Sequence, residues 1–396
     1  MTPTAFSPAD GPSATASPAA AAVSAALARL PRVVDLLAAR AEEHDRDATF
    51  PYQGVEALHE AGLLTLTVGQ RYGGPGGTLS DTVKVLSGLG RGDASVAVLA
   101  AFTLLRHAEQ ARTGSWPAAA YRRLLTESKR GPALVDTLRA EPGGTGELPA
   151  TVARRNGSNW LLTGRKTCCT GAEALAWMAV WARTDEAVPR TGLFLVRGDS
   201  PGVEVDPVCD QLGLRASAGH DVLLADVEVG ADAVVGLAGP GGHRPGTDPL
   251  DLAWHDLALA AVHLGVARSA QDWLVRFLKQ RTPANPSEPP ATLPRYRSAL
   301  GELASTLIGA EELVAGLAAR IDRGDPAAVD RAGVAQLLAN RAATAAVQQA
   351  VTLTGNLGLS RRHPLERYLR DVLSGRAHFP PEEAVLEAAA RAALEG

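Results

Sequence analysis

The sequence NWLLTGRKTCCTGA, residues 159–172, belongs to a β-rich segment in the middle of a chain of 396 residues. Trp, Leu, Val and Thr are frequent in this segment, and Gly, Pro, Asp and Asn separate its short apolar runs. Runs of this kind at close spacing predict a small β-barrel or sandwich of about 100 residues. The predicted strands are Thr151–Ala153, Asn159–Thr163, Trp177–Ala182, Gly192–Arg197, Gly202–Val205 and His220–Val229.

Helical periodicity flanks this segment on both sides. From residue 26 to about 130, apolar residues recur at three- and four-residue spacing, as Leu27, Leu30, Val34 and Leu37 show. We therefore predict an α+β fold with an N-terminal helical domain (26–130), a middle β-barrel domain (131–238) and a C-terminal four-helix bundle (239–396). The helices predicted after the β-domain are Leu250–Arg281, Pro294–Asp322, Pro326–Thr354 and Pro364–Ser374, with a last helix that starts near Pro380.

Composition narrows the class of protein. The first 25 residues are rich in Pro, Ala, Ser and Thr and lack the charged start and apolar core of a secretory signal, so we predict a disordered tail over 1–25. Lys and Arg number 39 against 43 Asp and Glu, a near-neutral balance that argues against a nucleic-acid partner. No run approaches the roughly 20 apolar residues of a membrane span. The cysteines (Cys168, Cys169 and Cys209) show no disulfide or metal-ligand spacing, and a cytoplasmic globular protein is expected.

Four motifs, in order and with the domain change between them, resemble the acyl-CoA dehydrogenase superfamily. The first lies in residues 50–77 and ends in the turn Tyr72–Gly77, and the second is Leu162–Ala172 with Ala182–Asp185. The other motifs are Leu212–Ser217 with Asp226–Val229, and Gly355–Gly358 with Pro364–Asp371. The resemblance covers about residues 30 to 390, and it implies the three-domain fold of that superfamily.

The resemblance also implies a bound FAD that lies between the β-domain and the bundle and reaches a neighbouring subunit. It thus implies a homo-oligomer, a dimer or a tetramer. Motif by motif, it implies that Thr137 and Thr170 hydrogen-bond the flavin, Cys168 replaces a ring-stacking aromatic residue, Arg281 meets the pyrophosphate, and Thr352 and Gly355 come from the partner subunit.

Each of these residues also has a simpler interpretation. Thr170 fits an ordinary strand position, Arg281 a helix-end arginine, and Gly355 a helix C-cap. The chain departs from the family pattern after Arg281, where Thr282–Asn285 opens a Pro-rich loop. Thr352 stands where the family has glutamine. These departures predict fewer partner contacts, so that flavin is held loosely or arrives already reduced.

The usual catalytic glutamate of the family is missing. Aligned on Arg370-Asp371 its position is Phe379, and aligned on Leu264-Gly265 the alternative position is His255. The segment 370–380, with His378, resembles the flavin monooxygenases of the same superfamily, in which a histidine near the flavin donates a proton or hydrogen bond. His378 and His255 are therefore the candidate catalytic residues.

Other interpretations of the missing base stay open. His378 also fits a capping position at a loop–helix junction, and Glu382 and Glu383 fit the first turn of a helix. Asp256 adjoins His255, but helix neighbours do not share a face. Four other histidines fit helix-surface or family-pattern positions: His59, His107, His220 and His263.

The leading functional hypothesis is an FAD-dependent oxidoreductase that dehydrogenates an acyl thioester, bound to CoA or a carrier protein, at Cα–Cβ. The hydride of the substrate passes to the flavin, and an electron-transfer partner then reoxidises the flavin. The alternative is a two-component monooxygenase that receives reduced flavin from a reductase and acts on a small carbon, nitrogen or sulfur centre. The third hypothesis is a flavin-free scaffold. No metal, nucleic acid or membrane is expected.

Overall fold

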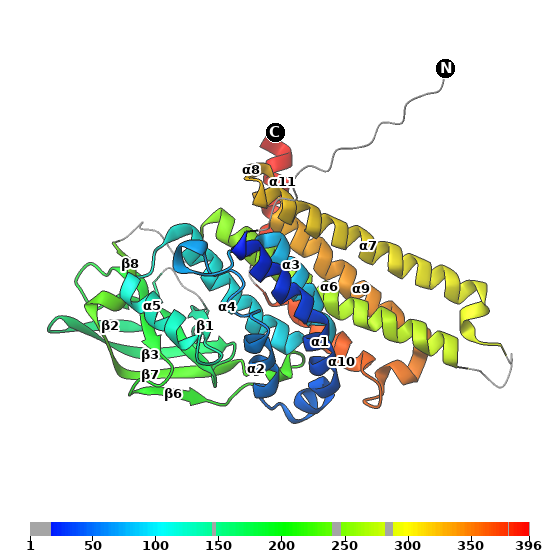
Figure 1. The fold of residues 1–396 in the computed structure, drawn as a ribbon, viewed down its shortest axis with the longest axis horizontal. Helices are drawn as coiled ribbons and strands as arrows, with labels where there is room; N and C mark the ends of the chain where they lie inside the picture. Colours follow the sequence, from blue (N-terminus) through cyan, green and yellow to red (C-terminus); the bar gives the residue numbers. More distant parts are fainter. Residues whose placement is uncertain (1–16, 145–147, 240–246, 282–287, 379, 396) are drawn as a thin grey trace, which may run out of the picture.

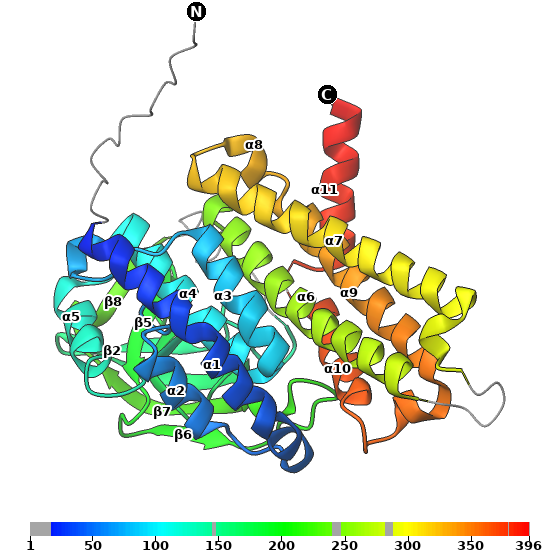
Figure 2. The same ribbon diagram turned by 45° about the vertical axis from the view of Figure 1, so that its right-hand side comes forward.

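The computed structural model describes residues 17–144, 148–239, 247–281, 288–378 and 380–395. Figure 1 shows N-terminal helices, a β-sheet domain and C-terminal helices. The N-terminal helices lie between the other two parts, because α3 (Leu79–Gly92) packs on α6 (Pro249–Gln280), and α4 (Ala94–Thr113) contacts both α6 and β1 (Leu134–Leu138) (Figure 2). The predicted α+β fold and domain order are confirmed.

Helix α1 (Pro18–Asp47) begins earlier than the sequence suggested. Ser17 accepts a hydrogen bond from the Ala20 amide at 3.2 Å, and Pro18 fits the first turn, where an N–H would lack a helical partner. The prediction of a disordered tail over 1–25 is therefore wrong for residues 18–25, while residues 1–16 lie outside the described residues. The next helices are α2 (Tyr52–Glu60), η1 (Gln70–Tyr72), α3, α4 and α5 (Ala118–Glu127).

The middle domain forms one sheet, in which all six predicted strands are present. The strand order is β6-β7-β3-β2-β4-β5-β8, and β1 pairs in parallel with β4. Strands β1 and β8 were not predicted, because each has a residue that is rare in strands at its centre, Asp136 in β1 and Gly236 in β8. The remaining strands are β2 (Val152–Asn156), β3 (Asn159–Cys169), β4 (Leu175–Thr184), β5 (Thr191–Arg197), β6 (Val203–Asp206), β7 (His220–Val229) and β8 (Val234–Ala238).

Strand β4 is buried on both faces of the sheet. Met178 and Val180 belong to the large core shared with the helices, whereas Trp177 and Trp181 belong to a second core that includes Tyr121 of α5. Side chains alternate between the two faces along a strand, so each face of β4 meets a different core. Because both faces of β4 are packed, β4 is held in place, and so is its neighbour β1, which carries Thr137.

The C-terminal part is a bundle in which α6 packs against α9, and α7 packs against α9. The predicted helix Pro326–Thr354 is interrupted at Asp330-Arg331 and forms two helices. Helix α11 projects from the body in both ribbon views (Figures 1 and 2). The elements are α6, η4 (Pro290–Thr292), α7 (Pro294–Asp322), α8 (Pro326–Val329), α9 (Ala332–Thr354), η5 (Gly355–Leu359), α10 (Leu365–Leu373), η6 (Ser374–Arg376) and α11 (Glu382–Glu395).

Helix α6 is the centre of the bundle, and two glycines let it approach α3 closely. A Cβ atom on Gly90 would lie 2.3 Å from the Val262 carbonyl oxygen, and one on Gly265 would lie 2.2 Å from the Ser87 carbonyl oxygen. Both contacts are impossible, so only glycine permits this packing. Helix α6 is also long and apolar enough to span a membrane, but 78% of its most apolar window is buried in the protein.

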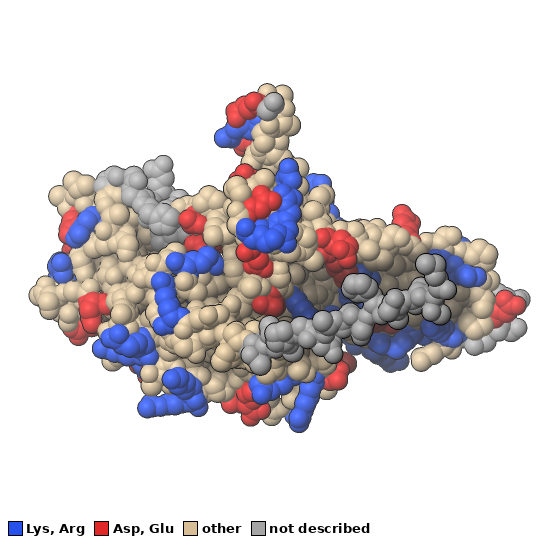
Figure 3. Space-filling model, turned by 45° about the horizontal axis from the view of Figure 1, so that its top comes forward, with Lys and Arg blue, Asp and Glu red and all other residues tan. Residues whose placement is uncertain are grey.

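The surface carries charges of both signs. Figure 3 shows Lys and Arg interspersed with Asp and Glu over the face in view. This pattern accords with the formal net charge of −4.

Candidate functional site

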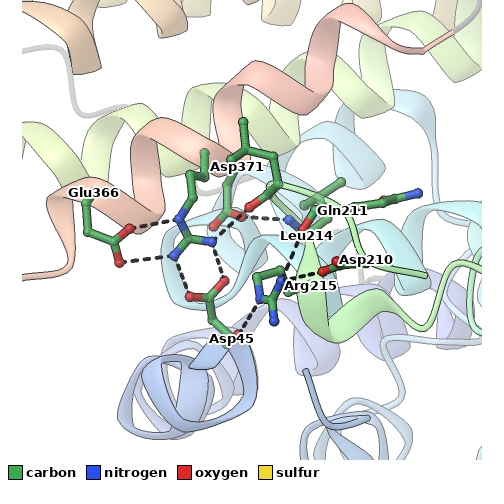
Figure 4. Close-up of polar contacts among 9 residues, drawn as sticks. Asp45, Asp210, Gln211, Leu214, Arg215, Glu366 and Asp371 are labelled. Carbon is green, nitrogen blue, oxygen red and sulfur yellow. Dashed lines mark hydrogen bonds and ion pairs between the residues drawn. The ribbon is translucent and has the colours of Figure 1, made fainter. Parts of the chain in front are cut away.

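Two of the sequence motifs meet in space, where the loop 212–217 packs on α10 (Figure 4). The Leu214 amide donates to Asp371 Oδ1 at 2.9 Å, and Arg370 Nη1 donates to the Leu212 carbonyl at 3.0 Å. Arg370 also pairs with Asp45 of α1 and with Glu366. We call this set of contacts the Arg370 clamp, and it joins α1, α10 and the loop that follows the β6 strand.

The carboxyl group of Asp371 is buried within this clamp. Burial raises its pKa to about 7, and the negative charges of Asp45 and Asp93 add to that effect. The Leu214 amide and the guanidinium of Arg367 oppose the shift because they favour the carboxylate. We therefore expect Asp371 to change its charge near neutral pH.

The clamp continues into the loop that holds Cys168 and Thr170. The Gly171 amide donates to the Ser217 carbonyl at 2.7 Å, which ties the end of β3 to the 212–217 loop. Cys168 (φ 54°) and Leu214 (φ 54°) lie in the left-handed region that non-glycine residues rarely adopt. Strained backbone of this kind clusters at ligand-binding sites. The loops therefore fit a cofactor cradle, and the exposed Cys168 lies at its surface.

Thr137 lies on β1 and faces α4. Its Oγ1 accepts a hydrogen bond from Arg106 Nη1 at 3.2 Å, and Arg106 also pairs with Glu109. Arg106 was not among the predicted site residues, because nothing in the apolar sequence of α4 shows that residue 106 faces Thr137. Its pKa is raised by Glu109 and by Asp136, against the opposing effect of burial.

Three histidines come together where the η6 segment meets α6. The rings of His263 and His378 have centroids 5.5 Å apart. Burial lowers the pKa of His378 well below its usual range, and the neighbouring His263 and His255 lower it further. Burial also lowers the pKa of His263 to about 4. His263 is thus a core residue, so the surface interpretation of it is wrong.

These histidines have free polar atoms. His378 Nε2 and both ring nitrogens of His263 are buried and have no hydrogen-bond partner among the described residues. Asn340 of α9 donates to the Gly375 carbonyl at 3.1 Å and so seats the η6 segment against the bundle. A Cβ atom on Gly375 would come within 3.1 Å of the His263 ring, so this approach requires a glycine or a shift of the ring.

His255 lies two turns before His263 on α6. Its ring stacks near Phe102 with centroids 6.3 Å apart, and its Nδ1 lies 3.4 Å from Asp256 Oδ1. The interpretation that Asp256 does not interact with His255, because helix neighbours do not share a face, is therefore wrong. Burial raises the pKa of Asp256. Glu382, the other alternative base, forms an exposed ion pair with Arg341.

The remaining predicted residues lie at the opposite end of the bundle. Arg281 follows α6, is exposed, and places its guanidinium 5.4 Å from the Phe277 ring centroid. Thr352 Oγ1 donates within α9 to the Gln348 carbonyl, and Gly355 follows that helix with φ 61°. Helices α6 and α9 end on the side away from the sheet (Figure 1). The structure therefore separates this group from Thr137, Cys168 and Thr170; Phe379 lies outside the described residues.

Family models match the chain in all three parts. Acyl-CoA dehydrogenase N-terminal, middle and C-terminal domain models match residues 32–113, 140–227 and 257–381. The chain belongs to the acyl-CoA dehydrogenase superfamily. The prediction from the four motifs is thereby confirmed, and so is the expectation of a flavoprotein of this superfamily.

The chain is similar to members with different chemistries. It is 29% identical to the putative acyl-CoA dehydrogenase YdbM of Bacillus subtilis over 93% of this chain and 96% of YdbM. The structure of KijD3 with FMN and dTDP-3-amino-2,3,6-trideoxy-4-keto-3-methyl-D-glucose is 29% identical, with a TM-score of 0.78 and 94% of each chain covered. A nitrososynthase from Micromonospora carbonacea var. africana is 26% identical, with a TM-score of 0.81 over 94% of this chain and 96% of its own.

Proposed function

We propose that this protein is a monooxygenase that uses reduced flavin and O2 to oxygenate a small polar substrate. One oxygen atom enters the substrate, and the other leaves as water with the two electrons of the flavin. The observation that carries the proposal is the buried, unpartnered Nε2 of His378, whose ring has a pKa held well below its usual range. Two of the relatives support an oxygenating reaction on a polar substrate: KijD3 is described in complex with FMN and an amino-keto sugar nucleotide, and the other is named a nitrososynthase.

The state of His378 suits hydrogen bonding better than proton abstraction. A ring that is neutral at pH 7 has one N–H donor and one bare nitrogen. The neutral ring can donate a hydrogen bond to the oxygen atom that is transferred, or it can pass a proton to that atom near pH 7. A base that removes an α-proton works best when its pKa lies near the working pH, and burial has moved His378 away from that value.

The flavin fits the two groups of residues that the sequence predicted. When bound, flavin supplies two-electron redox chemistry and reaction with O2. Its ring would be held by Thr170 and Cys168, which lie beside the 212–217 loop, and by Thr137 on β1. Arg281 would hold its phosphate end, since a guanidinium binds phosphate oxygens in a bidentate way.

The separation of these groups supports a homo-oligomer. Arg281, Thr352 and Gly355 lie at the end of the bundle away from the sheet, so they would reach the flavin of a partner subunit (Figure 1). An open groove of about 390 Å³ between the end of α6 and the start of α7 lies at the same end and includes Leu278 and Tyr296. A flavin reductase would supply the reduced cofactor, and a cytoplasmic location stays a prediction.

A dehydrogenase is the second candidate, supported by the His255–Asp256 pair and by the similarity to YdbM. Asp256 is a buried carboxyl group with a raised pKa, as a base for an α-proton requires. In this case an acyl thioester would reduce the flavin directly, and an electron-transfer partner would reoxidise it.

Anaerobic mixing separates the two functions. The purified protein with oxidised flavin is mixed with butyryl-CoA under nitrogen, and the visible flavin band is followed. We expect no bleaching. In a second experiment the protein, reduced FMN and the amino-keto sugar nucleotide of the KijD3 complex are mixed with O2, and we expect an oxygenated product. Bleaching by butyryl-CoA together with no product in the second experiment would establish the dehydrogenase instead.

A further inference from the structure

Helix α4 carries two arginines whose hydrogen bonding is incomplete. Arg106 uses Nη1 for Glu109 and for Thr137, but its Nε is buried and has no partner among the described residues. Arg112 pairs with Asp251, and its Nη1 is likewise buried without a partner in the described part of the chain. An N–H donor removed from water without a partner costs free energy, so both sites favour an acceptor.

Arg106 lies close to the residues proposed for cofactor and catalysis, and Arg112 lies further along α4. Arg106 reaches Thr137, on the flavin side. The guanidinium of Arg112 lies 4.6 Å from the ring centroid of Trp254, the residue before His255. Phe102, one turn before Arg106, stacks near the His255 ring. The face of α4 that carries Phe102 and Arg106 therefore runs from the Thr137 side to the His255 side, where a substrate must lie to meet both.

The charges around the two arginines decide which acceptor fits. Glu109 pairs with Arg106 and Asp251 with Arg112, so both guanidinium charges are already balanced. Asp136 is a further carboxyl group close to Arg106, and burial raises its pKa to about 6. An anionic group would add negative charge beside Glu109, Asp251 and Asp136. A neutral oxygen acceptor gains the hydrogen bonds without that repulsion.

We propose that Arg106 binds a carbonyl or hydroxyl oxygen of the substrate, so that the site favours an oxygen-rich substrate such as a keto sugar. This inference rests on the proposed function and names its substrate class. The alkyl part of an acyl thioester offers no acceptor beyond its carbonyl group, whereas a sugar carries oxygen on most of its carbon atoms and so suits the Arg106 donor better. A site built to hydrogen-bond oxygen rejects the analogue that lacks it.

Equilibrium binding to the FMN-loaded protein tests the proposal. The probes are dTDP-4-keto-6-deoxyglucose and dTDP alone, which differ by the sugar that Arg106 is proposed to contact. We expect the wild type to bind the keto sugar more tightly than dTDP. Arg106→Met removes the donors at similar volume, and it should lower keto-sugar affinity about tenfold or more while dTDP affinity stays the same. Arg106→Lys, which keeps the charge but lacks Nε, should lose most of the same preference and serves if Arg106→Met fails to fold.

The control is Arg91→Met, which removes an exposed arginine paired with Asp272 on α3 and α6 and should change neither affinity. The proposal is overturned if the wild type shows no preference for the keto sugar, whether it binds both probes equally or neither. It is also overturned if both Arg106 variants keep the preference. The anaerobic flavin reduction described above is read separately on the wild type, so failure of the monooxygenase assignment is distinguishable from failure of this substrate assignment.

Discussion

Two buried polar regions of this protein differ in how completely their hydrogen bonds are made. In the Arg370 clamp, the side chains of Arg370 and Asp371 are bonded to acidic side chains and to backbone groups of the 212–217 loop. Around His263 and His378, buried ring nitrogens have no partner among the described residues. Buried polar atoms are normally paired, and exceptions mark catalytic roles or absent ligands. The clamp therefore stabilises the fold, whereas the histidine region has the unpaired nitrogens that the proposed chemistry requires.

The largest expected effect is that of His378→Ala, which tests whether the histidine region differs from the clamp in having a catalytic role. If the ring acts on a reacting oxygen, product formation should fall by about 10²–10⁴-fold, as for loss of a general acid or base. Reduced flavin should still react with O2, so hydrogen peroxide would replace the product. Oxygen uptake, peroxide and product are measured together. The free energy of unfolding is measured as well, because the substitution also removes the packing of the ring against His263.

A change of only a few-fold in both peroxide and product would make His378 a loop residue without a catalytic role. His255→Ala is the comparison variant on the same cluster. If His378 holds the reacting oxygen, His255→Ala should give the same peroxide yield as the wild type.

The second prediction concerns the clamp, where Arg370→Ala should act on stability. The substitution leaves Asp45 and Glu366 largely buried without their cation, and breaking a buried pair costs about 3–5 kcal/mol. Urea unfolding measures the loss. Arg46→Ala removes an exposed pair with Asp47 on the same helix as Asp45, and its cost should be about 0–1 kcal/mol. Equal effects of the two substitutions would show that the clamp is not a stabilising network.

The clamp also predicts a pH dependence through Asp371. Its folded-state pKa of about 7 lies above the ordinary value of 3.8, so the folded protein binds a proton that the unfolded chain releases first. The contribution of this group to stability is therefore present below about pH 4 and is lost as pH rises toward 7. Each pKa unit corresponds to about 1.4 kcal/mol, which limits the total to about 4 kcal/mol.

Asp371→Asn isolates this effect, because the amide oxygen still accepts from Leu214 but carries no charge. The stability of the variant relative to wild type should rise between pH 5 and pH 8, measured by urea unfolding at each pH. A constant difference over that range would mean that Asp371 keeps one charge state throughout.

The sequence predicted the helices well, and motifs predicted the family. The long periodic helices, such as α6 and α7, were found because each has an apolar face that repeats every three or four residues. The capped start of α1 at Ser17 was missed because its alanine-rich first turns have no apolar periodicity. Strands β1 and β8 were missed because Asp136 and Gly236, residue types that are rare in strands, stand at their centres.

The candidate site was predicted only in part. Motifs indicated His378 and His255, but they did not show that His263 completes a buried cluster with them, since its apolar neighbours resemble any core helix. Arg106 was missed because its contact with Thr137 joins residues 31 positions apart. Neither the pairing of these residues nor the unpaired state of their nitrogens can be read from local sequence, because both depend on tertiary packing.

The smallest expected effect concerns Arg281, which belongs to neither buried region. It is exposed at the end of α6 and contacts the Phe277 ring, so Arg281→Ala should change the free energy of unfolding by less than about 0.5 kcal/mol. If it meets the phosphate of a flavin in a partner subunit, the substitution removes charge-assisted hydrogen bonds of about 1.5–3 kcal/mol. Flavin affinity, measured by equilibrium dialysis, should then fall by about 10- to 100-fold. Arg323→Ala, at the exposed end of α7, is the matched control and should leave affinity unchanged. Equal affinity of the two variants would place Arg281 outside the cofactor site, and Thr352 and Gly355 would lose their main support as residues contributed by the partner.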